Sequence, residues 1–420
     1  MDRRTMLRRA AALTAAGAGG GLLAACTGGQ EEPAAALPPL PQPAEEETYG
    51  PRSVRLGITA QSDAAPVVMA QELGYFGERD LQVRIEKLAS AQAIRDALVG
   101  GQLDAAHGQY SIPLALAAGI GGLSARSVKI AMVLSANGQA ITLNQDFSAV
   151  GYGDLAAVRE LLEGNALTLA MTFPGGTHDT WLRYWLKASG ADIGRFNIIS
   201  TAADQMVENM RFGNLSGYSV DEPWNTLAVQ EGFGFTHLTS QDIWRNHPEK
   251  ALLVTERFAQ DRGDILREVM GAVLQACRWL DDAENRNQAA EVMSEQQYVD
   301  LFAPTIRGRL LGRYDLGGGQ LPRRYENGAG RVQFHLNGEV NAPRRSHAVW
   351  FLTQYQRFGL LTQEPPYLEI ADDLLLRDAY AEVAAAASVA VPADDMTPFE
   401  VQLDGATFDP AAPGAERVRP

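Results

Sequence analysis

The pattern of apolar and polar residues predicts strands and helices in alternation through the first half of the chain. Residues 54–59 alternate polar and apolar side chains, as a half-buried strand does. Ser62 followed by Pro66 is typical of a helix start, and Gly74 is typical of a helix end. Further strand patterns lie at 81–87, 103–108, 128–134, 167–173, 197–199 and 217–220. The alternation predicts an α/β fold with mainly parallel sheets flanked by helices.

The second half of the chain is predicted to be mainly helical. Apolar residues with helical spacing run through 258–280, 288–302 and 348–358. The chain has 420 residues, which is more than one hydrophobic core usually serves, so the sequence indicates two lobes. Ligands of α/β proteins bind where loops leave the carboxyl ends of the strands, and a binding site is expected there.

The N-terminus predicts export. Arg3 and Arg4 lie in a cationic segment that resembles a twin-arginine signal, and the apolar stretch at 10–25 is too short to span a bilayer. The stretch ends in Leu23-Ala24-Ala25-Cys26, which resembles a bacterial lipobox. We predict that residues 1–25 are a signal peptide and that Cys26 carries the lipid that anchors the protein to a membrane. The alternative is an ordinary signal peptide cut near Ala25.

A linker is predicted to follow the anchor. Residues 26–50 contain five prolines and five glutamates and almost no large apolar side chain, so this segment is expected to be disordered. If Cys26 is lipidated, Cys277 has no disulfide partner. Its place in an apolar helical run predicts a thiol in the core.

Composition excludes several classes of function. With 36 Lys and Arg against 51 Asp and Glu, the chain has a formal charge of −15 and no general basic surface for nucleic acid phosphates. The motifs of P-loop NTPases, zinc proteases and serine hydrolases are missing, and the six histidines have no metal-ligand spacing. We therefore predict no enzyme activity, no cofactor and no metal site.

One segment has the character of an anion site. The apolar strand at 167–173 leads into Pro174-Gly175-Gly176, and Thr177-His178-Asp179 opens a helix. Glycines let a ligand approach the backbone, and the first turn of a helix presents free N–H groups and a partial positive charge. A protonated His178 would add to that charge. The alternative is that Thr177 only caps the helix and that His178 is exposed.

Seven short motifs keep one order along the chain, at 59–66, 103–107, 137–143, 173–179, 221–225, 247–252 and 346–353. Among them are Phe173-Pro174-Gly175-Gly176-Thr177-His178-Asp179 and Asp221-Glu222-Pro223-Trp224-Asn225. Together they resemble the periplasmic nitrate-binding and bicarbonate-binding proteins of ABC transporters, which are close to the aliphatic sulfonate binders. The resemblance extends from about residue 54 to the Phe408-Asp409-Pro410 tail.

This resemblance implies a two-lobed type II periplasmic-binding-protein fold. Lobe 1 would comprise residues 51–145 and 251–413, and lobe 2 would comprise residues 146–250. The protein would be a monomeric, extracytoplasmic component of an ABC transporter that captures a small oxyanion, with nitrate or nitrite as the first candidates. It would deliver the oxyanion to a membrane permease and its ATPase.

The family pattern also implies the ligand-binding residues. Gln139, His178 and Lys250 fall on the positions that hold the oxyanion, and Asp63 and Asp221 would also line the cleft. Each unit charge about 4 Å from an anion contributes on the order of 4 kcal/mol at an effective dielectric constant near 20. The bicarbonate relatives are expected to have an acidic residue in place of Lys250, so Lys250 favours a simple anion over a metal-assisted one. The alternative is a surface lysine.

Two positions depart from the family pattern. Ala91 stands where the family has Trp, which would widen the pocket, and Asp221 stands where the family has Gly. A carboxylate at 221 would repel an anion unless it pairs with Lys250 or His178 or points away. Either the ligand differs in size or charge, or Asp221 forms an internal ion pair and the pKa of His178 is raised.

Three other functions are compatible with the same fold. The chain could bind bicarbonate or a sulfonate, or it could be a nitrate-sensing regulator. Such sensors are cytoplasmic, and the leader and Cys26 argue against this role. Thiamine-pyrimidine synthases share the fold but use a Cys-rich iron motif, which two cysteines cannot form.

Overall fold

The computed structural model describes residues 50–325 and 330–419. The predicted signal peptide, the lipidated Cys26 and nearly all of the linker lie outside these residues. Within the described part, no helix combines the length and the apolar character needed to cross a bilayer.

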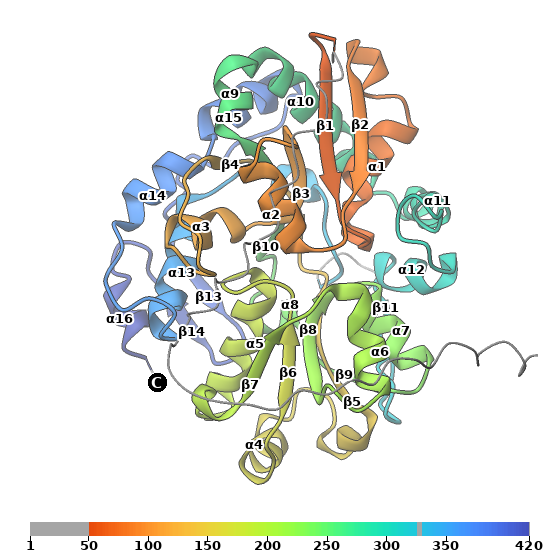
Figure 1. Cartoon of the computed structure of the whole chain (residues 1–420), viewed down its shortest axis with the longest axis vertical. Coiled ribbons are helices and arrows are strands. Elements are labelled where there is room, and N and C mark those ends of the chain that lie inside the picture. The colour runs from red at the N-terminus through yellow and green to blue at the C-terminus, as the bar shows by residue number, and fades with distance from the viewer. Residues whose placement is uncertain (1–49, 326–329, 420) are drawn as a thin grey trace, which may run out of the picture. The chain divides into compact units, whose positions relative to one another are not determined.

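Two five-stranded sheets form the framework (Figure 1). The first has the order β2 (Gln82–Lys87), β1 (Ser53–Ile58), β3 (Ala105–Gln109), β10 (Pro248–Thr255) and β4 (Val128–Ala136). The second has the order β7 (Asn197–Ser200), β6 (Thr168–Met171), β8 (Gly217–Asp221), β5 (Gln139–Asn144) and β9 (Gly234–Thr239). We call each sheet, with the helices packed on it, a lobe.

Each sheet is mixed, with the same pattern of pairing. In lobe 1, β1 is parallel to β2 and β3, whereas β10 is antiparallel to β3 and β4. In lobe 2, β6 is parallel to β7 and β8, whereas β5 is antiparallel to β8 and β9. In each sheet the strand that enters from the other lobe is the antiparallel one. The predicted α/β fold of two lobes is confirmed, with two antiparallel pairings in each sheet.

Helices of the first half cover the two sheets. They are α1 (Ala65–Glu72), α2 (Ala91–Val99), α3 (Ile112–Ala117), α4 (Leu155–Gly164), α5 (Thr177–Ala188), α6 (Met206–Arg211), α7 (Trp224–Gln230) and α8 (Ser240–Ile243). Gly74, at a φ of 77°, follows α1 as the sequence predicted.

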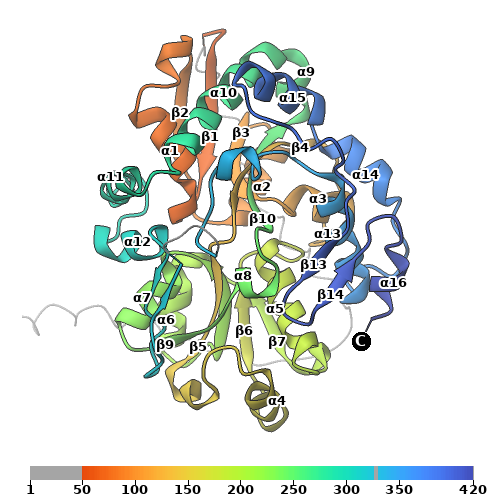
Figure 2. The ribbon, with the colours of Figure 1, turned by 180° about the vertical axis from the view of Figure 1, so that it is seen from behind.

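The second half is mainly helical, as predicted. Its helices are α9 (Glu256–Asp261), α10 (Gly263–Trp279), α11 (Ala283–Met293), α12 (Ala303–Leu310), α13 (Arg345–Arg357), α14 (Tyr367–Leu374), α15 (Arg377–Ala386) and α16 (Gly414–Arg417). Two small hairpins join β11 (Arg313–Tyr314) to β12 (Arg323–Arg324) and β13 (Phe399–Val401) to β14 (Ala406–Phe408). Figure 2 shows α13, α14, α16 and the β13–β14 hairpin from the other side.

The chain passes between the lobes at two short connections. It leaves β4 for β5 through Asn137 and Gly138, whose φ angles are 63° and 94°, and it returns to β10 after Asn246, whose φ is 60°. Residues 139–144 therefore pair in lobe 2 and residues 248–250 in lobe 1.

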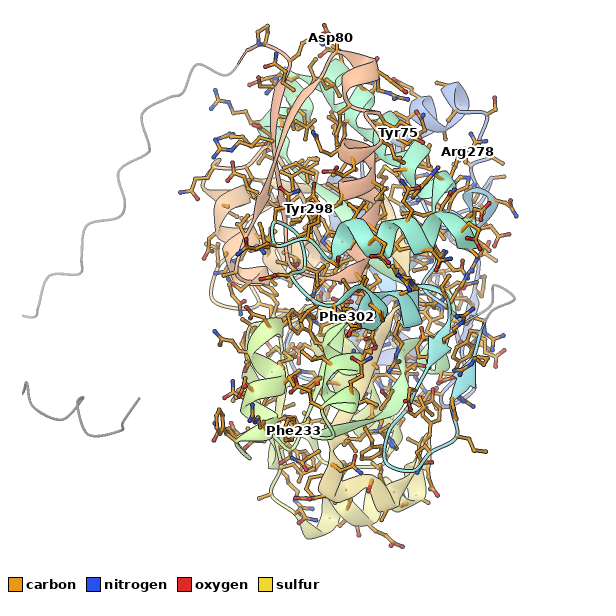
Figure 3. The ribbon with its side chains drawn as sticks, turned by 90° about the vertical axis from the view of Figure 1, so that its right-hand side faces the viewer. Tyr75, Asp80, Phe233, Arg278, Tyr298 and Phe302 are labelled. Atoms are coloured by element: carbon orange, nitrogen blue, oxygen red, sulfur yellow. The ribbon has the colours of Figure 1, made fainter. Side chains whose placement is uncertain are left out.

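The core contains most of the large apolar side chains. Cys277 on α10 is fully buried among them, which confirms the predicted core thiol. Phe302, just before α12, is an exception with three-quarters of its surface exposed (Figure 3). Tyr355 on α13 ties the lobes together, because its hydroxyl donates to the Ser111 carbonyl at 3.1 Å and lies 2.5 Å from the Gly175 carbonyl.

Candidate functional site

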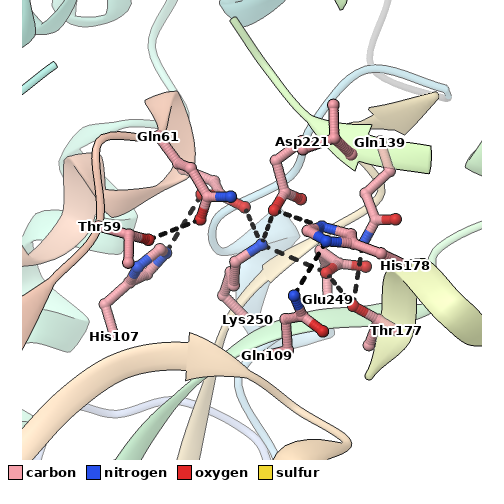
Figure 4. A network of polar contacts seen from close by, with 12 residues as sticks. Thr59, Gln61, His107, Gln109, Gln139, Thr177, His178, Asp221, Glu249 and Lys250 are labelled. Carbon is pink, nitrogen blue, oxygen red and sulfur yellow. Dashed lines mark hydrogen bonds and ion pairs between the residues drawn. The ribbon is translucent and has the colours of Figure 1, made fainter. Parts of the chain in front are cut away.

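The candidate site lies where the two sheets face each other. In lobe 1, Lys250 on β10 is in register with Gln109, the last residue of β3. In lobe 2, Gln139 at the start of β5 is in register with Asp221, the last residue of β8. Figure 4 shows these side chains converging from both lobes into one polar network. The site is thus at strand ends, as expected for an α/β protein.

The predicted turn before His178 is present. Gly175 has a φ of 73°, and Gly176 is the N-cap of α5. A Cβ on Gly176 would lie 2.1 Å from Oε1 of Gln109, so the close approach of β3 requires glycine there. His178, in the first turn of α5, is fully buried. The alternative of an exposed histidine is therefore wrong.

The hydrogen bonds of His178 fix its tautomer. Nδ1 lies 2.9 Å from Nε2 of Gln109 and 2.5 Å from Oγ1 of Thr172, and both neighbours can donate. Nδ1 is therefore the acceptor, and Nε2–H donates to Oδ2 of Asp221 at 2.6 Å. Burial lowers the pKa of His178, although the Asp221 carboxylate opposes the shift. The expected rise of this pKa is wrong because the loss of hydration outweighs the ion pair.

Lys250 is buried and surrounded by carboxylates. Its Nζ lies 3.0 Å from Oδ2 of Asp63 and 3.3 Å from Oε1 of Glu249, and it also donates to Oδ2 of Asp221. Burial disfavours the charge, but Asp221, Asp63 and Glu249 together raise the pKa of Lys250 above its ordinary value. Its side chain is only 2% exposed, so the alternative of a surface lysine is wrong. The geometry keeps a cation in the interior.

Asp63 and Asp221 serve as the counter-charges of this cation. Asp63, in the 3₁₀ turn before α1, also lies 3.2 Å from Nε2 of His107 through its other oxygen. Burial would raise the pKa of Asp221, but the hydrogen bond from His178 and the Lys250 ammonium lower it below its ordinary value, so Asp221 is ionised at neutral pH. The internal ion pair considered from the sequence is therefore present.

Glu249 joins the network but could not be identified from the sequence. Oγ1 of Thr177 donates to its Oε1 at 2.5 Å, and the Trp181 indole N–H donates to Oε2 at 3.3 Å. Gln139 in turn donates to Oγ1 of Thr177 at 2.9 Å. Burial raises the pKa of Glu249 to about 8. Neighbouring strand residues normally face opposite sides, but irregular pairing of β10 with β4 around Lys250 lets both side chains enter the site.

Three of these groups have the geometry of metal ligands. His178, Asp221 and Glu249 offer ligand atoms within 4.8 Å of one another. The Lys250 ammonium, however, already contacts both carboxylates. A divalent cation bound there would be repelled by this neighbouring charge. The carboxylates of this group are therefore better suited to the Lys250 ammonium than to a resident metal ion.

A cavity of about 410 Å³ opens beside the network. Lys250, Gln109, Trp224 and Ala91 are among the residues that line it. Of the five residues predicted to bind the ligand, Lys250 lines this cavity, whereas Gln139, His178, Asp221 and Asp63 do not. Hydrogen bonds and ion pairs nevertheless link all five into one network. Ala91, at the position where the family pattern has Trp, lines this cavity.

Comparison with known proteins places this geometry in a family. Residues 47–294 match the NMT1-like family. The nitrate/nitrite binding protein NrtA of Nostoc sp. strain PCC 7120 is 31% identical over 378 residues, which cover 86% of this chain and 83% of that protein. The chain belongs to the NMT1-like family, among the nitrate- and bicarbonate-binding proteins of ABC transporters. The family suggested by the motifs is confirmed.

A solved structure and a transporter component support the same placement. The periplasmic nitrate-binding protein NrtA from Synechocystis PCC 6803 matches with a TM-score of 0.82 at 31% identity, covering 87% of this chain and 97% of that one. The bicarbonate transport ATP-binding protein CmpC of Synechocystis sp. strain PCC 6803 is 31% identical over 328 residues, which are 76% of this chain and 48% of that protein. The chain has the periplasmic-binding-protein fold and is a solute-binding component of an ABC transporter, not an enzyme.

Proposed function

We propose that the protein captures a small oxyanion, nitrate or nitrite before others, on the outer side of a cell membrane and delivers it to an ABC permease. The observation that carries this proposal is the charge of Lys250. Its side chain is held between the lobes and lines the cavity, with His178 and Gln139 in the same network. The similarity to NrtA supports the choice of ligand.

The donors around the cavity suit an oxygen-rich anion. Lys250 would provide a charge-assisted hydrogen bond once one of the carboxylates that it contacts releases it, and such a bond typically contributes about 1.5–3 kcal/mol. Gln109 lines the cavity beside it and has an amide group. Because Lys250 and Gln109 belong to lobe 1 and Thr172 and Trp224 to lobe 2, a solute in the cavity contacts both lobes. Such a contact would stabilise the closed arrangement that a permease recognises.

The predicted export signal indicates where the protein would act. A twin-arginine signal would export the chain, and a lipidated Cys26 would hold it at the outer face of the membrane. The partners would be the permease and its ATPase. Similarity to NrtC, the nitrate import ATP-binding protein of Synechocystis sp. strain PCC 6803, supports this assembly, with 34% identity over about half of that protein.

A larger oxyanion is the second candidate, and the size of the cavity favours it. The cavity measures about 410 Å³, whereas about 10–15 Å³ by the same measure holds a water molecule. Nitrate has only four heavy atoms and would fill a small part of this space. A sulfonate with an apolar group would place its head at Lys250 and its tail beside Ala91 and Trp224. Bicarbonate has the size of nitrate and gains nothing from the extra room.

A melting screen of the purified full-length chain separates these candidates. Nitrate, nitrite, bicarbonate and short alkanesulfonates are added at increasing concentration. A ligand that binds only the native state at 100 times its Kd raises the free energy of unfolding by about 2.7 kcal/mol. The proposal predicts a rise with nitrate or nitrite. A rise with sulfonates alone supports the second candidate, and no rise with any oxyanion contradicts both.

A further inference from the structure

Two of the three donors expected to hold the oxyanion, His178 and Lys250, are bound to one carboxylate of the protein. Oδ2 of Asp221 accepts a hydrogen bond from Nε2 of His178 at 2.6 Å and another from Nζ of Lys250. All three side chains are almost completely shielded from solvent. The position that a solute oxygen would take between these donors is thus filled by a side-chain oxygen.

A carboxylate is chemically similar to the oxyanion whose position it takes. Like nitrite and nitrate, it is planar, carries one delocalised negative charge and accepts hydrogen bonds in its plane. The second oxygen of Asp221, Oδ1, is buried and has no hydrogen-bond partner among the residues that the structure describes. Only one oxygen of the group is therefore used, as for an anion held by two converging donors.

The same contact joins the two lobes. Lys250 lies on β10 in lobe 1, whereas Asp221 ends β8 and His178 begins α5 in lobe 2. Other polar contacts cross nearby, from Gln109 to His178 and from Thr177 to Glu249. A bridge between lobes is the role that a captured solute has in this architecture. Here the chain makes that bridge with its own anion.

We propose that Asp221 is the specificity-determining residue of the site: its carboxylate is a tethered competitor that occupies the oxyanion position, and nitrate binds there only when the Lys250–Asp221 pair separates. This inference rests on the proposed function. A site that is available in only about 1–10% of molecules binds its ligand about 10- to 100-fold more weakly than a site that is always available. Asp221 would thereby exclude small anions at low concentration.

Calorimetric titration of the full-length chain with sodium nitrate and sodium nitrite tests this inference. Asp221→Asn removes the charge at nearly constant shape, and Asp221→Gly removes the competing group entirely. Asp192→Asn makes the same chemical change at an exposed position of lobe 2 and is the matched control. The expected result is a nitrate Kd about 10- to 100-fold lower in both Asp221 variants, with Asp192→Asn unchanged. Melting curves verify folding, and the glycine variant decides if the asparagine variant does not fold.

The outcomes separate the inference from the proposed function. Equal or weaker nitrate binding by the Asp221 variants, with clear binding by the wild type, overturns the inference and leaves the proposed function. Binding by the variants alone supports the inference and contradicts nitrate as the wild-type solute. No binding by any of these proteins overturns both.

Discussion

Lys250 keeps a charge that burial alone would remove. Three carboxylates, from Asp63, Asp221 and Glu249, lie within reach of its ammonium and raise its pKa. A buried ion pair often contributes little net stability compared with an apolar pair, but removing one partner leaves an uncompensated charge. Removal of Lys250 is therefore expected to reduce stability by more than its ion pairs contribute to stability.

Replacing Lys250 is expected to destabilise the fold. Lys250→Met leaves Asp221 and Asp63 buried without their cation, which should reduce the free energy of unfolding by about 3–5 kcal/mol. Urea denaturation followed by circular dichroism measures the change. Lys187→Met, at a partly exposed position of α5, should stay within about 0.5 kcal/mol of the wild type. Equal stability of the two variants would show that the charge of Lys250 is not required by its neighbours.

Protonation of the buried His237 is expected to make the free energy of unfolding depend on pH. Burial lowers its pKa to about 4, and its Nδ1–H donates to the Gly151 carbonyl at 2.8 Å. Between pH 4 and about 6.5 the unfolded His237 binds a proton that the folded one does not, so the contribution of His237 to stability rises with pH by up to about 1.4 kcal/mol per unit. His237→Gln should reduce this slope in urea titrations between pH 4.5 and 7. An unchanged slope would contradict the assignment of the shift to this residue.

At the scale of elements, the alternation of strands and helices could be predicted because burial on sheets and helices imposes periods of two and 3.6 residues. The positions at which the chain crosses between the lobes could not be predicted. They depend on left-handed backbone at Asn137, Gly138 and Asn246, which leaves no period in the sequence. The predicted helix at 288–302 is also shorter, since α11 ends at Met293 and Asp300 has a φ of 63°.

A substitution at Gly176, in the turn before α5, is expected to disturb the packing of β3 on this turn. Gly176→Ala would place a methyl group 2.1 Å from Oε1 of Gln109 and 2.9 Å from the Phe173 carbonyl. Gln109 would have to move from His178, so we expect a loss of about 1–3 kcal/mol in stability and weaker nitrate binding.

The matched control for that substitution is Gly164→Ala at the end of α4. A Cβ at Gly164 meets nothing within 4 Å, and thermal melting should show an equal or higher midpoint. If Gly176→Ala behaves like this control, the close packing of β3 on the turn is not important for the site.

At the scale of the whole molecule, membrane attachment is predicted to depend on Cys26. Acyl chains contribute about 0.8 kcal/mol per buried CH₂ group, so their loss should release the protein. Cys26→Ser is expected to move the chain from the membrane fraction to the soluble fraction of cells, as seen by immunoblotting. Cys277→Ser, at the buried thiol, should leave the distribution unchanged. Retention of the Cys26 variant on membranes would contradict a lipid anchor at this residue.

The candidate site could be predicted in part. Motif order led to Gln139, His178, Lys250, Asp221 and Asp63, and the structure links all five. Gln109, Thr172 and Glu249 could not be found, because they enter through strand register and an irregular pairing of β10. Nor could the sequence decide between the possible roles of Asp221, because its pairing depends on the contact between lobes. The overall charge of −15 was equally uninformative about a site centred on one buried cation.

Capture of an oxyanion by Lys250 is tested by calorimetric titration of the wild-type protein and Lys250→Met with nitrate and nitrite, extended to millimolar concentrations. We expect saturable binding of at least one of these anions to the wild type, and no measurable binding to the variant at the same concentrations, with melting curves to verify that the variant is folded. Equal binding by both proteins, or no binding by the wild type, would contradict the claim that the buried charge of Lys250 captures an oxyanion.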